Sequence, residues 1–357
     1  MPDPVGILVD QRVLRRALRG RATLERVSLY RSIAQKDLNI DIVVFAVEHV
    51  DVRRHTVRGY VPTATGWRRV RMTVPSVVHK RVLYRESFPL RTLRRLEQRG
   101  VIFVNPIKIQ DKKRMAALLA RSPARNHLPP TASYSWRRLQ AMLDDGESAV
   151  LKPRVGSLGQ GVIRVSPVDA RRVEIVIRSR RIVSRSGLRR LLRARRGARR
   201  YILQRYVPLA TYQGRPFDLR VPVQRDGNGS WVIPGIVAKV ARKHPFLTNM
   251  AQGASAIPGE QALAAAFGKD ASHVIHRVKE LALHVARAVS DAHRYAGDLG
   301  LDVGVDRSGK PWLFEVNTRD QRYTFERAGL LDAFRALYRN PLAYCASLAK
   351  NQTPSGR

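Results

Sequence analysis

The sequence predicts a mixed α/β and α+β protein, in which a small α/β N-terminal domain precedes a larger α+β region. Three observations lead to this class. Short apolar strands alternate with helices near the N-terminus, a glycine-rich loop joins two strands in mid-chain, and a late hairpin carries carboxylates among apolar residues. The expected units are an N-terminal domain at 1–108, the glycine-loop region at 109–207, the carboxylate region at 208–350 and a disordered tail at 351–357.

The N-terminal elements follow from apolar runs and their boundaries. Continuous apolar runs are typical of strands that are buried on both faces. Such strands are expected at 5–9, 40–47 and 101–105, with alternating strands joined by loops over 59–82. Residues 89–100 are expected to form a helix, because leucines recur on one face and Gly100 marks its end.

The middle of the chain combines helices, a glycine loop and a basic stretch. Helices are expected at 112–123 and 136–146, followed by the strands AVLKP and GVIRVSP on either side of the loop. A hairpin, the helix GLRRLLRARRG and the strand YILQRYV come next. Residues 167–202 hold thirteen arginines and two acids, which form either a solvated face or a platform for a polyanion.

Two hairpins and a long helix are expected in the last third. Residues 217–241 read as two long strands joined at Asp-Gly-Asn-Gly, a strong hairpin signal. Residues 273–294 have the period of a long helix, and 299–317 read as a second hairpin that turns at 307–310.

Composition excludes several classes of protein. The single cysteine, Cys345, rules out an intramolecular disulfide and a multi-cysteine metal site. No apolar run reaches the roughly 20 residues that a membrane span needs, and the N-terminus lacks the order of a signal peptide. We therefore expect a cytoplasmic protein. Its net charge of +38 would attract polyanions and nucleotides, unless the arginines only decorate solvated faces.

The glycine loop has the properties of a phosphate-binding loop. Gly156, Gly159 and Gly161 lead from strand to strand, unlike the dinucleotide and Walker A motifs, which lead into a helix. Glycine allows backbone N–H groups to approach phosphate oxygens closely. Lys152, which ends the preceding strand, would add a mobile positive charge. An ordinary flexible hairpin remains the alternative.

The late hairpin carries a candidate magnesium site. Glu315 and Asn317 are two residues apart and share one face of a strand, and the hairpin can bring Asp302 onto that face. Burying two carboxylates without a cation would be costly. Magnesium prefers such oxygen ligands and commonly binds carboxylates together with substrate phosphates. Polar residues facing water at the edge of the hairpin are the alternative.

Taken in order, the motifs resemble those of the ATP-grasp superfamily. They are LKPRVGSLGQGV, LQRYVPL, FDLRVPVQ, GIVAKVA with TNMAQGA, GLDVGVD and LFEVN. The likeness is most specific to the YheC/YheD branch, whose members are endospore coat-associated proteins, and it runs from about residue 100 to 348. It implies an ATP-grasp fold, in which two α+β subdomains sandwich ATP, behind the N-terminal domain.

The resemblance also implies a role for each matching residue. Lys152 and either Lys112 or Lys113 would contact phosphates, beneath a mobile lid formed by Gly156, Ser157, Gly159 and Gly161. The adenine slot would be lined by Gln204, Tyr206 and Val207. Arg220 and Lys239 would be the catalytic cations at the γ-phosphate, and Asn249 would help to hold phosphate or metal. Mg²⁺ would be bound by Asp302, Glu315 and Asn317.

Three positions depart from the pattern of the superfamily. Many relatives carry an acid near position 204 and an arginine at position 239, where this chain has Gln204 and Lys239. A lysine cannot make the bidentate phosphate contact of an arginine. After EVN, many relatives continue into a proline-containing turn, whereas this chain reads TRDQR.

The activity that the resemblance implies is an ATP-dependent, ADP-forming ligation of a carboxylate to an amine or related nucleophile through an acyl-phosphate. The substrate could be an acidic peptide or polymer, which would also account for the charge. One alternative is a non-catalytic ATP-binding protein of a spore coat or other assembly. Another is a nucleic-acid-binding protein driven by charge, although only 7% of the residues are aromatic and no stacking motif accompanies the basic stretch.

Overall fold

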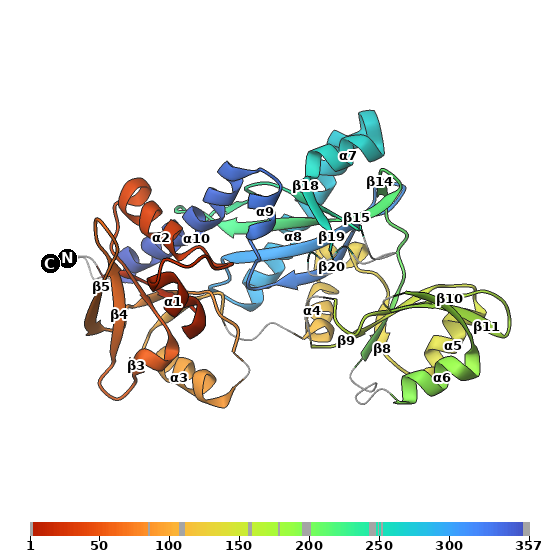
Figure 1. Cartoon of the computed structure of the whole chain (residues 1–357), viewed down its shortest axis with the longest axis horizontal. Coiled ribbons are helices and arrows are strands. Elements are labelled where there is room, and N and C mark those ends of the chain that lie inside the picture. The colour runs from red at the N-terminus through yellow and green to blue at the C-terminus, as the bar shows by residue number, and fades with distance from the viewer. Residues whose placement is uncertain are drawn as a thin grey trace.

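The computed structural model describes residues 3–84, 86–106, 111–155, 159–177, 179–194, 201–242, 248, 250 and 253–352. Three β-sheets with attached helices form the protein (Figure 1). Gly156, Ser157 and Asn249, and residues 353–357 of the expected tail, lie outside the described residues. Residues 351 and 352 belong to the last helix.

The first sheet has the strand order β3-β4-β2-β1-β6-β7, with β5 paired to β4. Its centre is parallel, because β1 pairs in parallel with β2 and β6, and β6 with β7. The strands are β1 (Val5–Leu8), β2 (Ile42–Phe45), β3 (Val50–Asp51), β4 (Thr56–Pro62), β5 (Trp67–Thr73), β6 (Val77–Lys80) and β7 (Ile102–Val104). The helices are α1 (Gln11–Leu18), α2 (Val27–Ile33) and α3 (Ser87–Gln98), with a π turn at Ala34–Leu38 and a 3₁₀ turn at Val47–His49.

The second sheet is antiparallel, in the order β12-β11-β10-β9-β13-β8. The strands are β8 (Thr131–Ser133), β9 (Ala149–Pro153), β10 (Ile163–Pro167), β11 (Arg172–Val176), β12 (Arg180–Ser184) and β13 (Tyr201–Arg205). Helices α5 (Trp136–Asp144) and α6 (Arg185–Ala194) pack on this sheet, whereas α4 (Lys112–Leu119) touches β8 but buries Met115 and Leu119 in the core of the third sheet. The glycine loop joins β9 to β10, as predicted. The helix expected at 112–123 ends earlier, because Pro123 begins a 3₁₀ turn at Pro123–His127.

The third sheet has the order β18-β17-β15-β19-β20, with β14 and β16 paired to β15. Its strands are β14 (Thr211–Tyr212), β15 (Arg215–Arg225), β16 (Trp231–Val232), β17 (Val237–Val240), β18 (Ser255–Pro258), β19 (Asp298–Val305) and β20 (Pro311–Asn317). The helices are α7 (Gly259–Phe267), α8 (Ala271–Ala292), α9 (Tyr323–Arg327) and α10 (Leu331–Gln352), with a 3₁₀ turn at Gly268–Asp270. The second long strand expected within 217–241 is wrong: it is split into β16 and β17 around Pro234, which has no N–H for the ladder.

The last helix, α10, packs against the first sheet. Its buried Leu337, Tyr338 and Leu342 share one apolar core with Val5 and Ile42 of the N-terminal strands. The two ends of the chain therefore form one core, although they are more than three hundred residues apart. No helix among the described residues is both long and apolar enough to cross a membrane.

Candidate functional site

A cleft between the second and third sheets is lined from both sides. Its volume is about 150 Å³. Lys152 of β9 faces this cleft from the second sheet, and Asp302 of β19 and Glu315 of β20 face it from the third. The glycine loop and the two carboxylates, predicted from separate motifs, therefore open onto the same hollow.

The register of the third sheet gathers its charged residues on one face. Asp218 and Arg220 are two apart on β15, so their side chains point the same way. Across the neighbouring strands, Asp218 pairs with Lys239 and Arg220 with Asp302, and Asp302 in turn pairs with Glu315. Four adjacent strands thus bring five charged side chains together.

Asp302 is the centre of this cluster. Its Oδ1 lies 2.6 Å from Lys239 Nζ and 3.3 Å from a terminal nitrogen of Arg220, and its Oδ2 accepts a hydrogen bond of 3.1 Å from the Asn317 amide. Burial alone would raise the pKa of Asp302, but Arg220 and Lys239 lower it to about 2. Asp302 is therefore ionised at neutral pH.

Lys239 and Asp218 are the second charged pair. Burial would lower the pKa of Lys239, but Asp218, 3.2 Å away, and Asp302 raise it above its ordinary value. The pKa of Asp218 is raised by burial, an effect that Lys239 only partly offsets. The lysine is consequently held in its charged form.

The structure distinguishes between the two candidate lysines at the start of α4. Lys112 Nζ lies 2.9 Å from Glu315 Oε1, and both residues line the cleft. Lys113 is exposed and does not line it. Asp111 caps the helix by accepting hydrogen bonds from the backbone of Lys113 and Arg114, which fixes the direction in which Lys112 leaves the first turn.

Lys152 is held at the opposite wall of the cleft. Its Nζ donates a hydrogen bond of 2.7 Å to Gln204 Oε1 and lies 5.1 Å from the centre of the Phe314 ring. The Gln204 amide donates in turn to Thr131 Oγ1 at 3.0 Å. Burial lowers the pKa of Lys152 to about 8, although Glu315 opposes this shift. Because Gln204 is neutral, it gives Lys152 a hydrogen-bond acceptor but no counter-charge.

The residues assigned to the adenine slot lie together at one end of the cleft. Gln204, Tyr206 and Val207 all line it, and Phe314 of β20 forms the facing apolar wall. The guanidinium of Arg164 lies 5.1 Å from the centre of the Tyr206 ring. Aromatic and apolar side chains of this kind can pack against a flat ligand.

The described part of the glycine loop borders the same hollow. Gly159 lines it, and Gly159 and Gly161 both have positive φ, +68° and +74°, which favours glycine. At Gly161 a β-carbon would come within 2.9 Å of the Tyr201 hydroxyl. A side chain at position 161 would therefore disturb the loop against β13.

Sequence reasoning missed several residues of the cleft. Asp218 and Thr248 line it, and Phe314 forms its apolar wall. The position of Asp218, two residues before Arg220 on one strand, was a signal that could have revealed it. In the sequence Phe314 is only an apolar neighbour of Glu315, and no local pattern indicates Thr248.

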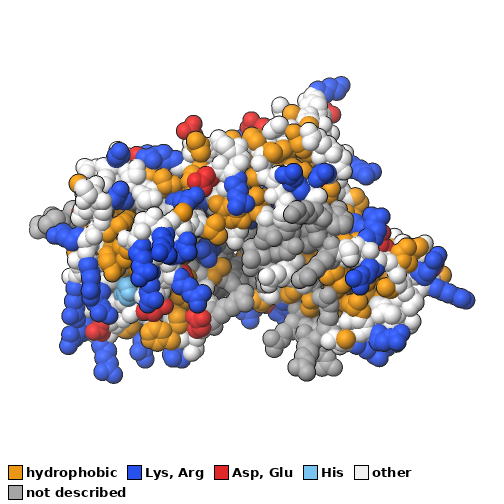
Figure 2. All heavy atoms as spheres, in the orientation of Figure 1, with side chains coloured by type: hydrophobic (Ala, Val, Ile, Leu, Met, Phe, Trp, Pro, Cys, Tyr) orange, Lys and Arg blue, Asp and Glu red, His pale blue; other side chains and the backbone are white. Residues whose placement is uncertain are grey.

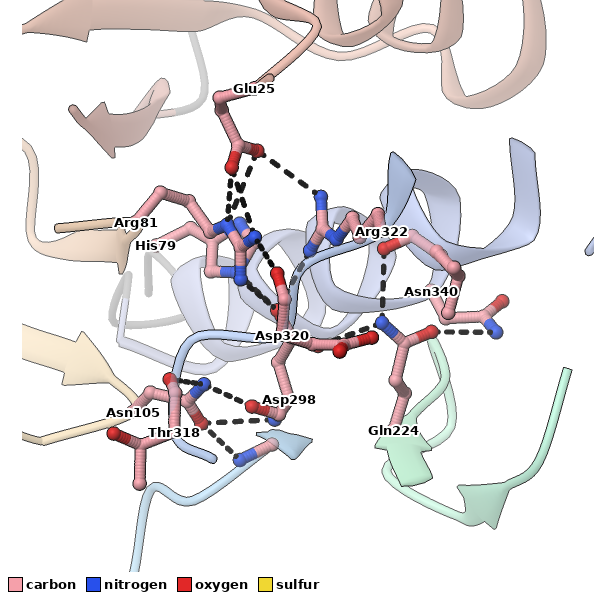
Figure 3. A network of polar contacts seen from close by, with 12 residues as sticks. Glu25, His79, Arg81, Asn105, Gln224, Asp298, Thr318, Asp320, Arg322 and Asn340 are labelled. Carbon is pink, nitrogen blue, oxygen red and sulfur yellow. Dashed lines mark hydrogen bonds and ion pairs between the residues drawn. The ribbon is translucent and has the colours of Figure 1, made fainter. Parts of the chain in front are cut away.

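A buried polar network joins the first sheet to β19 and to the segment after β20 (Figure 3). Asp298, at the start of β19, accepts from Arg81 at 2.8 Å and from Arg322 at 2.7 Å, and it lies 3.3 Å from His79. Asp298 is fully buried. Asp320, also in this network, lies 3.3 Å from Arg220, which carries the connection to Asp302.

A second hollow lies on the far side of the pair Lys112–Glu315. It has a volume of about 120 Å³, and Leu83, Asn317 and Arg319 contribute to its lining. Arg319 forms no ion pair or hydrogen bond with any other described residue. Burial and the neighbouring Arg81 lower its pKa below the ordinary arginine value. A partly buried guanidinium is thus available to an anion beside the carboxylate cluster.

A model of the family described as YheC/D like ATP-grasp matches residues 100–348, well over half of the chain. The chain belongs to this YheC/D-like ATP-grasp family. The matched residues contain the second and third sheets together with their cleft. The N-terminal sheet lies almost entirely outside the match.

Two curated relatives of this ATP-grasp chain come from Bacillus subtilis strain 168. Endospore coat-associated protein YheD is 22% identical over 334 residues, covering 87% of this chain and 71% of the relative. Endospore coat-associated protein YheC is 21% identical over 241 residues, covering 64% of each.

Solved ATP-grasp structures share the fold across nearly the whole chain. D-cycloserine synthetase DcsG has a TM-score of 0.55 at 14% identity, covering 97% of this chain and 99% of its own. The ATP-grasp ligase PsnB, solved with a minimal precursor, has a TM-score of 0.51 at 14% identity, covering 94% and 100%. A RimK domain ATP-grasp protein from Sphaerobacter thermophilus has a TM-score of 0.51 at 15% identity, covering 94% of this chain and 99% of its own. The ATP-grasp fold predicted from the motifs is confirmed.

Proposed function

We propose that this protein is an ATP-dependent carboxylate–amine ligase that works through an acyl-phosphate. The observation that carries the proposal is the shared cleft. An apolar slot bounded by Tyr206 and Phe314 opens onto the cations Lys112, Lys152 and Lys239, and the carboxylates of Asp302 and Glu315 lie beside them. The apolar slot suits the base of a nucleotide, the cations suit its triphosphate, and the carboxylates suit the metal that the triphosphate carries.

The carboxylate cluster fits magnesium. No group of three His, Cys, Asp or Glu side chains gathers into a metal site in the part of the chain that the structure describes. The fitting donors are Asp302, Glu315 and the amide oxygen of Asn317, all of which are hard oxygen ligands. The ion would neutralise phosphate charge and orient the reacting group. In the described structure the carboxylates pair with lysines, which are the natural partners of incoming phosphates.

The protein's own residues act by positioning and by charge. In the proposed reaction an acceptor carboxylate oxygen attacks the γ-phosphorus while the bond to the bridging oxygen of ADP breaks. The amine then attacks the acyl carbon, releases inorganic phosphate and loses a proton. Lys152, Arg220 and Lys239 stabilise the charge that develops on the transferred phosphoryl group, and no covalent enzyme nucleophile is required.

We assign the second hollow to the acceptor acid. Arg319 forms no ion pair or hydrogen bond with another described residue, although the charge of Glu25 acts on it, and it lines this hollow together with Glu315 and Asn317. A guanidinium recognises a carboxylate through two parallel hydrogen bonds. An acid held there would lie next to the proposed metal ligands, which is where the γ-phosphate would be attacked.

The test is ADP release from Mg·ATP across pools of carboxylic acids and amines, with mass spectrometry of the products. We expect ADP and an amide to form together with a suitable pair. Arg319→Gln should then raise the KM for the acid and leave the KM for ATP unchanged. ADP release without an amide product, or an unchanged KM for the acid, would contradict the respective part of the proposal.

Nucleotide binding should weaken as the pH rises through about 8. Burial lowers the pKa of Lys152 to about 8, so its charge is present below this pH and is lost above it. The Kd for Mg·ADP, measured by calorimetry from about pH 6.5 to about pH 9.5, should rise by up to tenfold per unit above that point. Lys152→Met should remove this dependence, whereas Lys113→Met, at an exposed position outside the cleft, should retain it. A flat wild-type profile would contradict the assigned role of Lys152.

A second candidate function follows from the names of the relatives. Because two of them are endospore coat-associated proteins, the chain could serve as a nucleotide-binding component of a spore coat. This candidate predicts that Mg·ATP binds and that no ADP forms with any acid and amine. The proposed spore association can be checked by locating a tagged copy of the chain in a sporulating host.

A further inference from the structure

A basic hollow lies on the first sheet, away from the nucleotide cleft. It has a volume of about 280 Å³ and lies between α1 and the β4–β5 hairpin. Its charged walls are Arg15 of α1, Arg58 of β4 and Arg69 of β5, and His49 completes the lining beside them. Figure 2 shows Lys and Arg side chains gathered over this part of the molecule.

The hairpin places its arginines on one face. Arg58 stands directly opposite Arg71, and Tyr60 directly opposite Arg69, so alternation puts all four on the same side of the hairpin. Like charges in directly opposite positions destabilise a strand pair. Arg68, between Trp67 and Arg69, points to the other face. Arg58 and Arg71 therefore repel each other on the face of the hairpin that borders the hollow.

The charges in the hollow are not neutralised within the protein. Arg15, Arg58 and Arg69 form no ion pair and no side-chain hydrogen bond with other residues of the described ranges, and no Asp or Glu lines the hollow. Burial and the charge of Arg58 lower the pKa of His49, and the neighbouring Glu48 only partly offsets this. Three exposed arginines thus border a hollow whose lining includes no carboxylate.

Two buried polar atoms also point to a missing partner. His49 Nδ1 and Gln11 Oε1 are both buried without a hydrogen bond. Buried polar atoms are usually paired, so an unpaired group is an indication of an absent water, ion or ligand. The side-chain amide of Gln11 can rotate to present its N–H₂ to an acceptor. An acceptor-rich anion would pair with the arginines, with the Gln11 amide once it is rotated, and with His49 in the tautomer that carries its proton on Nδ1.

We propose that this hollow binds a multiply charged oxyanion of the phosphate class, either free or carried by a polymer. Planar guanidinium groups match phosphate oxygens through paired hydrogen bonds. Three converging positive charges suit a polyvalent group better than a single carboxylate. The site lies outside the residues assigned to the ligase reaction, so it gives part of the positive charge a role independent of catalysis.

The test is calorimetric titration with inorganic pyrophosphate while saturating Mg·ADP occupies the nucleotide cleft. We expect binding that weakens between about 50 mM and about 200 mM NaCl, and at least tenfold weaker binding in Arg58→Gln/Arg69→Gln. The matched control is Arg68→Gln, which removes an exposed charge from the opposite face of the same strand and should bind as the wild type does. Thermal unfolding of each variant verifies that it is folded.

Two further titrations, one with citrate and one with a long polyphosphate, identify the kind of ligand. Citrate should bind at least tenfold more weakly than pyrophosphate, because its charge is spread over three separate carboxylates and is not concentrated on two linked phosphoryl groups. A long polyphosphate that binds more tightly per site than pyrophosphate would indicate a polymer, and equal affinity would indicate a free anion; both outcomes support the proposal. Three outcomes would overturn the proposal. The first is equal affinity for pyrophosphate in the wild type and in Arg58→Gln/Arg69→Gln, and the second is a loss of affinity in Arg68→Gln as large as in that double variant. The third is citrate binding as tightly as pyrophosphate.

Discussion

Glu315→Ala is expected to lower ADP-forming turnover by about 10²–10³-fold while the fold persists. Glu315 supplies one of the two carboxylates at the proposed metal site, and no neighbouring acid can replace it on β20. Its side chain is 30% exposed, and among the described residues its one ion pair is with Lys112 at 2.9 Å. The loss of that pair should change the free energy of unfolding by no more than about 1 kcal/mol.

The measurement is steady-state ADP release with a productive acid and amine, together with a urea unfolding curve for each variant. Glu315→Gln keeps the shape of the side chain and should be nearly as inactive as the alanine variant, because the charge is what the metal requires. Glu147→Ala removes a surface acid, 3.4 Å from Arg205 and 40% exposed, and should retain full turnover. Full turnover in Glu315→Ala would refute the assigned metal site.

Asp298→Ala is expected to reduce the free energy of unfolding by about 3–5 kcal/mol, because it leaves buried charges without a partner. Arg81 and Arg322 would both lose a carboxylate at less than 3 Å, and Gln224 would lose the acceptor of a 2.8 Å hydrogen bond. Glu25 would remain to compensate these arginines only in part. Burial would raise the pKa of Asp298, but Arg322 and Arg81 hold it well below its ordinary value.

Urea unfolding with linear extrapolation measures this change. The matched control is Glu326→Ala, which breaks the surface pair of Arg26 and Glu326, whose side chains are 33% and 36% exposed. Its effect should stay below about 1 kcal/mol. Comparable losses in the two variants would mean that the buried network contributes no more than a surface ion pair.

The hairpin and the glycine loop of the site could be predicted because the sequence patterns that define them are local. The turn at 307–310 and the alternation on either side of it define the hairpin β19–β20, and with it the pairing of Asp302 with Glu315. The spacing of glycines between two apolar runs likewise defines the loop that joins β9 to β10. In both cases the residues involved are neighbours in sequence, so a short pattern is sufficient.

Other features depend on contacts between distant segments. Lys112 and Lys113 have the same chemistry, and the choice between them follows from how α4 docks beside β20. The split of the second long strand around Pro234 was a local error, since the missing N–H was visible in the sequence. The basic hollow escaped detection because α1 and the β4–β5 hairpin are separate along the chain.

By itself, the sequence determined the family motifs, most strands and helices, and the types of residue that carry the proposed chemistry, since each is written in a short run of the chain. Only the tertiary structure decided which charges meet. The partners of Asp302 come from β15 and β17, and those of Asp298 from the first sheet and the segment after β20. Strand register and burial set these distances, and the strength of an ion pair depends on both.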